Sequence, residues 1–158
     1  MLATQDFQNV VKNTPLIAID FLVHGEGGRL LVGKRTNRPA LGFLMVPGGR
    51  VYKDESLNMA MSRIFMDEFG FQLDYEDISF LGIYDHIYDE GPFLYSPEIT
   101  SHYVVIAVNV KLKIDIDNLP KNQHSSYLFL SLDEINERDD VHMFTRQYFS
   151  QAPINKFL

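Results

Sequence analysis

A glycine turn followed by a helix with acidic side chains is the part of this sequence best suited to chemistry. The turn is Pro47-Gly48-Gly49, and the helical pattern after it carries Asp67 and Glu68 near its end. Counted at about 100° per residue, Glu68 lies at the centre of the helix's apolar face. A carboxylate there is costly unless it is paired or binds a cation. Because this helix has no Cys or His, its oxygen ligands favour Mg²⁺ or Mn²⁺.

The alternative for Glu68 is a solvated carboxylate at the point where the helix leaves the core. The flanking glycines favour metal ligation, because they let the backbone approach a ligand closely. Glu55 and Arg63, two helical turns apart, are expected to form a structural ion pair that holds the preceding loop on the helix.

Three arginines form a second group of candidates. Arg35 and Arg38 stand in a basic loop, and Arg50 follows the glycine turn. A planar guanidinium donates two parallel hydrogen bonds to phosphate oxygens, which suits a phosphorylated ligand. The alternative for each is a solvated surface cation.

A third group combines single polar residues with aromatic ones. Asp20 interrupts an apolar strand, where it is either buried with a partner or solvated at a strand edge. His86 alternates with Tyr84 and Tyr88, which predicts an aromatic face for a base or sugar, or for core packing. His124, in a polar loop, is either a general base, since histidine takes up protons at neutral pH, or a solvated side chain.

The elements that must position these residues follow from periodicity and turn signals. The glycine-turn helix is expected over 54–69, with Asp54 as its N-cap and Gly70 in the left-handed C-terminal position. A long loop between strands contains Gly91, Pro92 and Pro97. Strands are expected at 16–23, 30–32, 43–46, 80–88, 103–110 and 127–130, and further helices at 4–13, 132–137 and 143–150. This order predicts an α+β, layered α/β/α fold with a mixed β-sheet flanked by helices, in one domain over 1–158.

Composition narrows the partners. The net charge is −7, with 21 acidic and 14 basic residues among 158, which argues against nucleic-acid binding. There is no Cys, so disulfides and thiolate metal sites are excluded. No apolar stretch is long enough to span a membrane and no signal peptide is visible, so a cytoplasmic protein is expected.

The segment 49–71 resembles the Nudix box, G-x5-E-x7-R-E-U-x-E-E-x-G-U, where U is a bulky apolar residue. Asp67 replaces one glutamate of the pattern, and Ile64 replaces another that often ligates metal in pyrophosphate-cleaving members. The resemblance therefore implies a Nudix hydrolase, while Ile64 points away from ordinary pyrophosphatase chemistry. The positions that match are Gly49, Glu55, Arg63, Phe65, Glu68, Gly70 and Phe71.

Outside the box the chain is similar to one branch of this family, the GDP-mannose mannosyl hydrolases. The resemblance implies Mg²⁺-dependent release of GDP and free sugar, by water attack at sugar C1 with inversion. It also implies a homodimer. The segments that carry it are 13–16, 30–40, 46–51, 102–105 and 123–124.

The same resemblance implies a role for each candidate residue. The metal would be held by the Gly48 carbonyl, Glu68 and Gln123. His124 would be the general base, and Arg35 would contact the diphosphate. Substrate contacts are expected from Asp20, Arg35, Arg38, Arg50, His86 and Tyr103.

Two other functions remain open from the sequence. Retention of Glu55, Arg63, Asp67 and Glu68 is compatible with a Nudix pyrophosphohydrolase that cleaves a P–O bond. The other alternative is a non-catalytic domain that binds a nucleotide sugar and reports it to a partner. Such a domain is expected to have lost its metal ligands, whereas this chain keeps Glu68.

Overall fold

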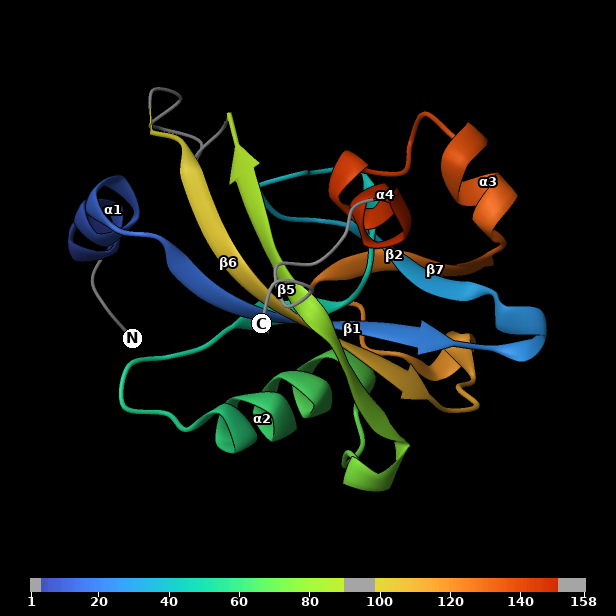
Figure 1. Ribbon diagram of the computed structural model, residues 1–158. Coiled ribbons are helices and arrows are strands. Elements are labelled where there is room, and N and C mark those ends of the chain that lie inside the picture. Colours follow the sequence, from blue (N-terminus) through green and yellow to red (C-terminus); the bar gives the residue numbers. More distant parts are fainter. Residues whose placement is uncertain (1–3, 90–98, 151–158) are drawn as a thin grey trace.

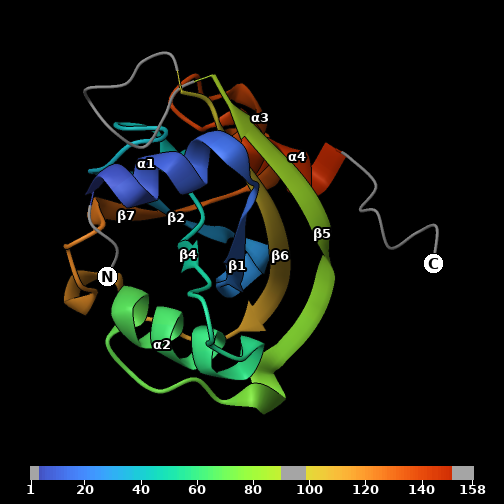
Figure 2. The same cartoon turned by 90° about the vertical axis from the view of Figure 1, so that its left-hand side faces the viewer.

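A twisted seven-stranded sheet lies between helices on its two faces (Figure 1) in a computed structural model that describes residues 4–89 and 99–150. Helix α2 (Leu57–Phe69) covers one face, whereas α3 (Leu132–Glu137) and α4 (Met143–Ser150) lie on the other, as the turned view also shows (Figure 2). Helix α1 (Thr4–Asn13) packs beside β6. The strands are β1 (Leu16–His24), β2 (Leu30–Arg35), β3 (Leu44–Met45), β4 (Gly48–Arg50), β5 (Ile78–Tyr88), β6 (Ser101–Lys111) and β7 (His124–Leu130), with 3-10 turns at Glu26–Gly28, Tyr75–Asp77 and Ile116–Asn118.

The sheet is mixed, as predicted, and it divides beside its central strand. Its order is β3-β2-β1-β6-β5, and β1 runs parallel to β6 while the other pairs are antiparallel. In the described chain β1 and β2 are paired at His24 and Leu30 and then separate. Strand β4 then pairs with β1, and β7 pairs with β2. This division leaves room for a cavity between the two halves.

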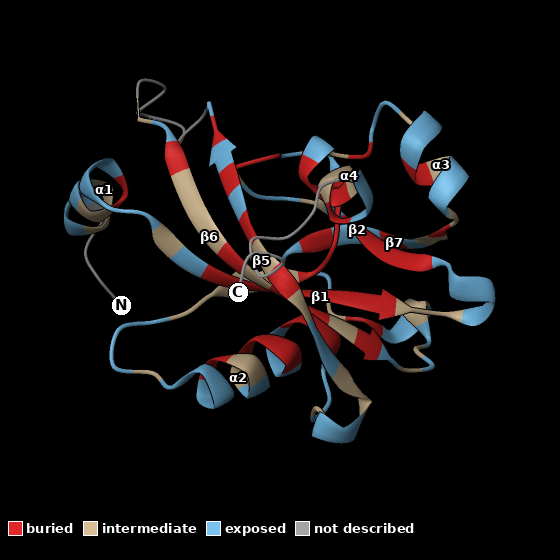
Figure 3. Ribbon diagram, viewed as in Figure 1, coloured by how far each residue is buried: buried red, intermediate tan, exposed pale blue. Residues whose placement is uncertain are grey.

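Most of β1 is buried (Figure 3). Its side chains alternate between two core clusters, one on each face of the sheet. Phe21 packs edge to face against Phe65 of α2, with ring centroids 5.2 Å apart. Leu22, on the opposite face, belongs to the cluster that includes Ile135 of α3 and Tyr148 of α4. Even-numbered residues of β1, Asp20 among them, therefore face the α4 side. None of the helices in the described ranges is long and apolar enough to cross a membrane.

Helix α2 starts later than its sequence pattern indicated. The expected N-cap Asp54 is wrong: Ser56 is the cap, and its side chain accepts a hydrogen bond from the backbone N–H of Met59 at 3.2 Å. Asp54 has a positive φ of 66° and contacts Lys53 instead. The C-terminal expectation is confirmed, since Gly70 adopts a φ of 80°. An aspartate and a serine are both good caps, but Asp54 has a positive φ, whereas Ser56 has the extended backbone of an N-cap.

Two other expectations are corrected. Gly48 and Gly49, expected in a turn, belong to β4, which pairs with β1. His124, expected in a polar loop, is the first residue of β7 and is fully buried. The expected loop with Gly91, Pro92 and Pro97 lies outside the described residues.

Candidate active site

One cavity of about 320 Å³ gathers almost all of the predicted site residues. It lies beside β1 and β4, at the C-terminal half of α2, and beneath the loop that follows β2. Nine of the ten predicted residues line it: Asp20, Arg35, Arg38, Gly48, Arg50, Glu68, His86, Tyr103 and Gln123. The tenth, His124, is not among its lining residues.

Glu68 is buried in the way that its position on the helix predicted. It is 4% exposed, so the alternative of a solvated carboxylate is wrong. Its Oε2 lies 3.2 Å from Nδ1 of His124, but the two are not aligned as a hydrogen bond. Glu68 Oε2 therefore has no hydrogen-bond partner among the described residues, which is costly for a carboxylate that stays ionised.

His124 lies behind Glu68 rather than in the cavity. Its ring is fully buried and packs against Gly33, where a Cβ atom would come within 2.5 Å of the imidazole. Nδ1 also lies 3.5 Å from the hydroxyl of Tyr127. In this arrangement the imidazole does not reach a water molecule in the cavity.

Gly48 and Gln123 line the same cavity as Glu68. Gly48 is opposite Asp20 in the β1–β4 pairing, and a Cβ atom there would meet Asp20 Oδ1 at 2.2 Å. Only glycine fits this close approach. The Gln123 side-chain oxygen accepts a hydrogen bond of 2.8 Å from the amide of Asn37.

The donors present fit a divalent cation that takes mixed oxygen ligands. Within residues 4–89 and 99–150, no three His, Cys, Asp or Glu side chains gather closely enough to hold a metal by themselves. A cation here needs backbone and amide oxygens beside Glu68, as the predicted set of Gly48, Glu68 and Gln123 supplies. The buried, unsatisfied Oε2 of Glu68 is the observation that supports such a site.

The arginines bring positive charge to the cavity. Arg35 donates through Nε to the Pro39 carbonyl at 2.9 Å, which fixes the guanidinium at the end of β2. Arg50 is held differently, with its guanidinium 4.0 Å above the centre of the Phe7 ring of α1 and 5.9 Å from that of Tyr52. These two cations come from different strands and line the same cavity.

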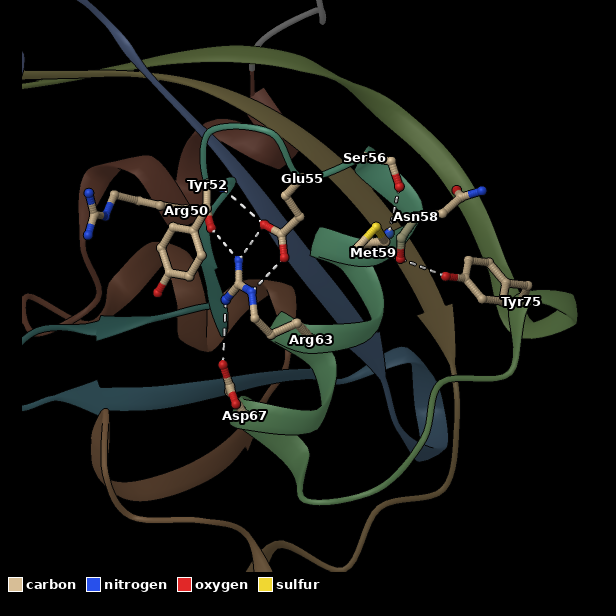
Figure 4. Close-up of polar contacts among 9 residues, drawn as sticks. All are labelled: Arg50, Tyr52, Glu55, Ser56, Asn58, Met59, Arg63, Asp67 and Tyr75. Atoms are coloured by element: carbon tan, nitrogen blue, oxygen red, sulfur yellow. Dashed lines mark hydrogen bonds and ion pairs between the residues drawn. The ribbon is translucent and has the colours of Figure 1, made fainter. Parts of the chain in front are cut away.

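The expected Glu55–Arg63 pair is confirmed and ties the loop after β4 to α2 (Figure 4). Arg63 donates through Nε and Nη2 to the two carboxylate oxygens of Glu55, at 2.7 and 2.8 Å. Nη2 also donates to the Arg50 carbonyl at 2.8 Å, and the guanidinium stacks 3.9 Å from the centre of the Tyr52 ring. The pair therefore fixes the backbone that carries Arg50 and Tyr52.

We predict that Glu55→Gln lowers the free energy of unfolding by about 1–2 kcal/mol at pH 7, because it weakens charge-assisted hydrogen bonds. The hydrogen bonds from Arg63 lower the pKa of Glu55, so its contribution is complete above the ordinary glutamate pKa and disappears as pH falls through the lowered value. Thermal melting of both proteins between pH 7 and pH 3 should show the difference closing on acidification. Glu26→Gln, which removes an exposed pair with Lys113 at 3.8 Å, should change little. A difference that persists unchanged at pH 3 would contradict this account.

Asp20 and His86 form a buried polar patch on the α4 side of the cavity. Asp20 is 9% exposed and His86 is 2% exposed, so the alternative of a solvated Asp20 is wrong. Burial raises the pKa of Asp20 from 3.8 to about 6, while a hydrogen bond from Tyr148 and the nearby Arg35 act in the opposite direction. Burial lowers the pKa of His86 to about 3, so this ring is neutral at pH 7. Tyr103, on the neighbouring strand, also faces the cavity, and burial raises its pKa.

Three further residues, none of them predicted as a site residue, support this site. Tyr148 hydrogen-bonds Asp20, Phe7 stacks on Arg50, and Asn37 binds Gln123. Asn37 is adjacent to the predicted Arg38, so the basic loop was a signal for it. Phe7 and Tyr148 are distant in sequence from every other site residue and lie on apolar helix faces, which carry no signal beyond core packing.

Comparison with known proteins agrees with this geometry. The NUDIX domain model matches residues 14–152. The low-salt glycan biosynthesis protein Agl8 of Haloferax volcanii is 38% identical over 121 residues, covering 76% of this chain and 73% of that protein.

Two solved structures share the fold at low identity. The MutT protein of Methanosarcina mazei Go1 has a TM-score of 0.68 at 21% identity, covering 88% of this chain and 94% of that one. The MutT NUDIX hydrolase of Burkholderia pseudomallei has a TM-score of 0.66 at 21% identity, covering 89% and 99%. Together with the family match over most of its length, these likenesses show that the chain belongs to the Nudix hydrolase family.

Proposed function

We propose that this Nudix hydrolase cleaves a nucleoside diphosphate sugar, with GDP-mannose as the favoured substrate, into GDP and free sugar. Water attacks C1 of the sugar with inversion, and the bond between C1 and the diphosphate oxygen breaks. The observation that carries the proposal is that one cavity holds two chemically different sets of side chains. Arg35, Arg38 and Arg50 suit a diphosphate, whereas buried Asp20 and neutral His86 suit an uncharged hydroxylated ring.

The arginines of the cavity provide for the leaving group. As the bond at C1 breaks, negative charge grows on the diphosphate oxygen that departs. Arg35, fixed by Pro39, and Arg50, held against Phe7, can donate charge-assisted hydrogen bonds to the diphosphate without first being ordered. Arg38 also lines the cavity and is the third candidate for the phosphates.

Nudix hydrolases generally use divalent metals such as Mg²⁺ or Mn²⁺. In this chain the Gly48 carbonyl, Glu68 and Gln123 would hold Mg²⁺, with Mn²⁺ as a substitute. When bound, the ion supplies positive charge that neutralises the diphosphate. Gln123 is already oriented by Asn37, and Glu68 is a buried carboxylate that lines the cavity.

The proposed general base is His124, which removes a proton from the attacking water. Because its ring is buried behind Glu68, this role requires the start of β7 to move when substrate binds. Catalytic hydrogen bonds are often completed only in the substrate complex. Gln123, the preceding residue, already lines the cavity, so the required movement is local.

The name of the Haloferax volcanii relative supports the substrate class. That relative is a glycan biosynthesis protein, and nucleotide sugars are the activated donors from which glycans are made. A homodimer is part of the same proposal, and sedimentation equilibrium of the purified protein tests it.

One observation favours a second candidate, hydrolysis of a P–O bond. Asp67 lines the cavity beside Glu68, so two carboxylates of the Nudix box are present there. The replaced glutamate position argues against it, since Ile64 is 2% exposed and its Cγ2 would lie 3.0 Å from a Cβ atom on Gly49. This position is filled by apolar packing and offers no ligand.

Product analysis separates the two candidates. The protein is incubated with GDP-mannose and Mg²⁺, and the reaction is monitored by phosphorus NMR. We expect GDP and free mannose as the products. GMP and mannose 1-phosphate would establish the second candidate instead.

A further inference from the structure

Three buried polar residues from three different elements meet at the α4 side of the cavity. The hydroxyl of Tyr148 in α4 donates a 2.5 Å hydrogen bond to Oδ2 of Asp20 in β1. The same hydroxyl oxygen lies 3.4 Å from Nε2 of His86 in β5. Asp20 and His86 line the cavity, whereas Tyr148 lies behind them and is 6% exposed. Tyr148 therefore contacts the site without facing its contents.

The direction of the hydrogen bonds follows from the proton count. A tyrosine hydroxyl has one proton to donate, and a carboxylate oxygen at 2.5 Å is its acceptor. Toward His86 the hydroxyl oxygen can then only accept, so Nε2 carries the proton of the neutral ring. The result is a chain of hydrogen bonds from His86 through Tyr148 to Asp20.

This chain fixes the Asp20 carboxylate from one side, and the backbone fixes it from the other. Oδ2 is occupied by Tyr148, while Oδ1 lies against Gly48, where a Cβ atom would approach it to 2.2 Å. A carboxylate held in this way loses little rotational freedom when it accepts a hydrogen bond from a ligand.

Ring packing at helix α4 holds Tyr148 and His86, the other two residues of this hydrogen-bond chain, in place. The Tyr148 ring meets that of Tyr84 edge to face, with centroids 4.8 Å apart and planes at 87°. One helical turn earlier, Phe144 stacks on His86, with centroids 4.4 Å apart and planes at 4°. Phe144 and Tyr148 thus make α4 the backing of this wall of the cavity.

We propose that Tyr148 is a positioning residue for the sugar subsite, holding Asp20 so that its Oδ1 accepts a hydrogen bond from a hydroxyl of the sugar ring. The proposal rests on the proposed function, because it requires a nucleotide sugar in the cavity. Tyr148 then helps the site to distinguish a nucleotide sugar from the bare nucleoside diphosphate, although its side chain contacts neither ligand.

The test compares Tyr148→Phe with the wild type and with Tyr84→Phe. The Tyr84 hydroxyl is also buried and has no hydrogen-bond partner among the described residues, so its removal is a matched control in the same ring cluster. We expect Tyr148→Phe to lower kcat/KM for GDP-mannose about 10- to 100-fold, the effect of losing a hydrogen bond to a charged group. The Kd of GDP with Mg²⁺, measured by calorimetry, should change less than about twofold, since GDP has no sugar ring. Tyr84→Phe should leave both quantities at the wild-type level.

A double-mutant cycle asks whether Tyr148 acts through Asp20. Asp20→Asn alone should lower kcat/KM, and Tyr148→Phe added to it should cause no further loss. Full and independent loss from both substitutions would contradict the proposal, and so would wild-type kcat/KM in Tyr148→Phe. Loss of GDP binding or of the folded structure in Tyr148→Phe would assign the hydroxyl a general structural role and overturn it.

The wild type separates this inference from the proposed function. A wild-type protein that neither hydrolyses GDP-mannose nor binds it more tightly than GDP overturns both. The other case is a wild type that hydrolyses GDP-mannose and binds it more tightly than GDP. If Tyr148→Phe then distinguishes GDP-mannose from GDP as well as the wild type does, the positioning role alone is overturned.

Discussion

Replacing His124 by Gln should lower kcat for GDP-mannose hydrolysis about 10²- to 10⁴-fold, the usual contribution of a general base. A glutamine side chain has similar reach but does not take up a proton at neutral pH. Steady-state kinetics at saturating substrate measures the effect, because the base acts in the chemical step. The matched control is His102→Gln, which removes a half-buried histidine that contacts Asp85 and does not line the cavity.

Because His124 is buried beside Glu68, a lower kcat in His124→Gln has a second explanation besides loss of the base. His124 contacts Glu68 at 3.2 Å, so its removal could act by displacing a proposed metal ligand. Loss of the base alone leaves the affinities for Mn²⁺ and GDP at the wild-type level. A weakened affinity for Mn²⁺ in step with kcat would assign His124 to the support of Glu68, and an unchanged kcat would remove it from the mechanism.

Glu68→Gln should lower kcat/KM about 10³-fold and weaken Mn²⁺ binding measured by electron paramagnetic resonance. The physical reason is that a bound divalent ion supplies several kcal/mol of charge stabilisation, and the variant loses the one buried carboxylate on its predicted ligand set. In the presence of EDTA the melting temperature should not fall, because glutamine fills the same volume and removes a buried charge without a hydrogen-bond partner.

Glu137→Gln provides the control for the change in net charge, since Glu137 is exposed at the end of α3. Asp67→Asn, measured beside it, reports on the competing chemistry. If the two carboxylates of the Nudix box act together on phosphorus, Asp67→Asn should lose rate as strongly as Glu68→Gln. Wild-type Mn²⁺ affinity and rate in Glu68→Gln would refute the metal site altogether.

The fold was largely predictable because it rests on local patterns. The period-2 strands, the helix with its apolar stripe, and Gly70 each depend on a few neighbouring residues. The incorrect predictions concern local structure that the residue types alone do not determine. Gly48 to Arg50 form a strand only because β1 presents a free edge to them, and no residue type in that turn indicates it. Asp54 was a plausible cap by residue type, but its backbone has a positive φ and Ser56 caps the helix instead.

The candidate site was predictable to the extent that chemistry shows in the residue type. A carboxylate on an apolar helix face and an aspartate inside an apolar strand both conflict with simple burial, and both line the cavity. The residue type alone did not settle the position of His124, because a histidine is equally compatible with an exposed base and with a buried partner of Glu68. Tyr148 could not be predicted as a site residue, since a tyrosine on the apolar face of a short helix is compatible with ordinary core packing.

The most direct test of the central claim is the fate of the oxygen from water. The wild-type protein is incubated with GDP-mannose and Mg²⁺ in H₂¹⁸O, and the nucleotide product is analysed by mass spectrometry. Attack at C1 gives GDP without ¹⁸O, because the diphosphate keeps the oxygen of the broken bond. GDP that contains ¹⁸O, or labelled GMP or mannose 1-phosphate, would show attack at phosphorus and contradict the proposed mechanism.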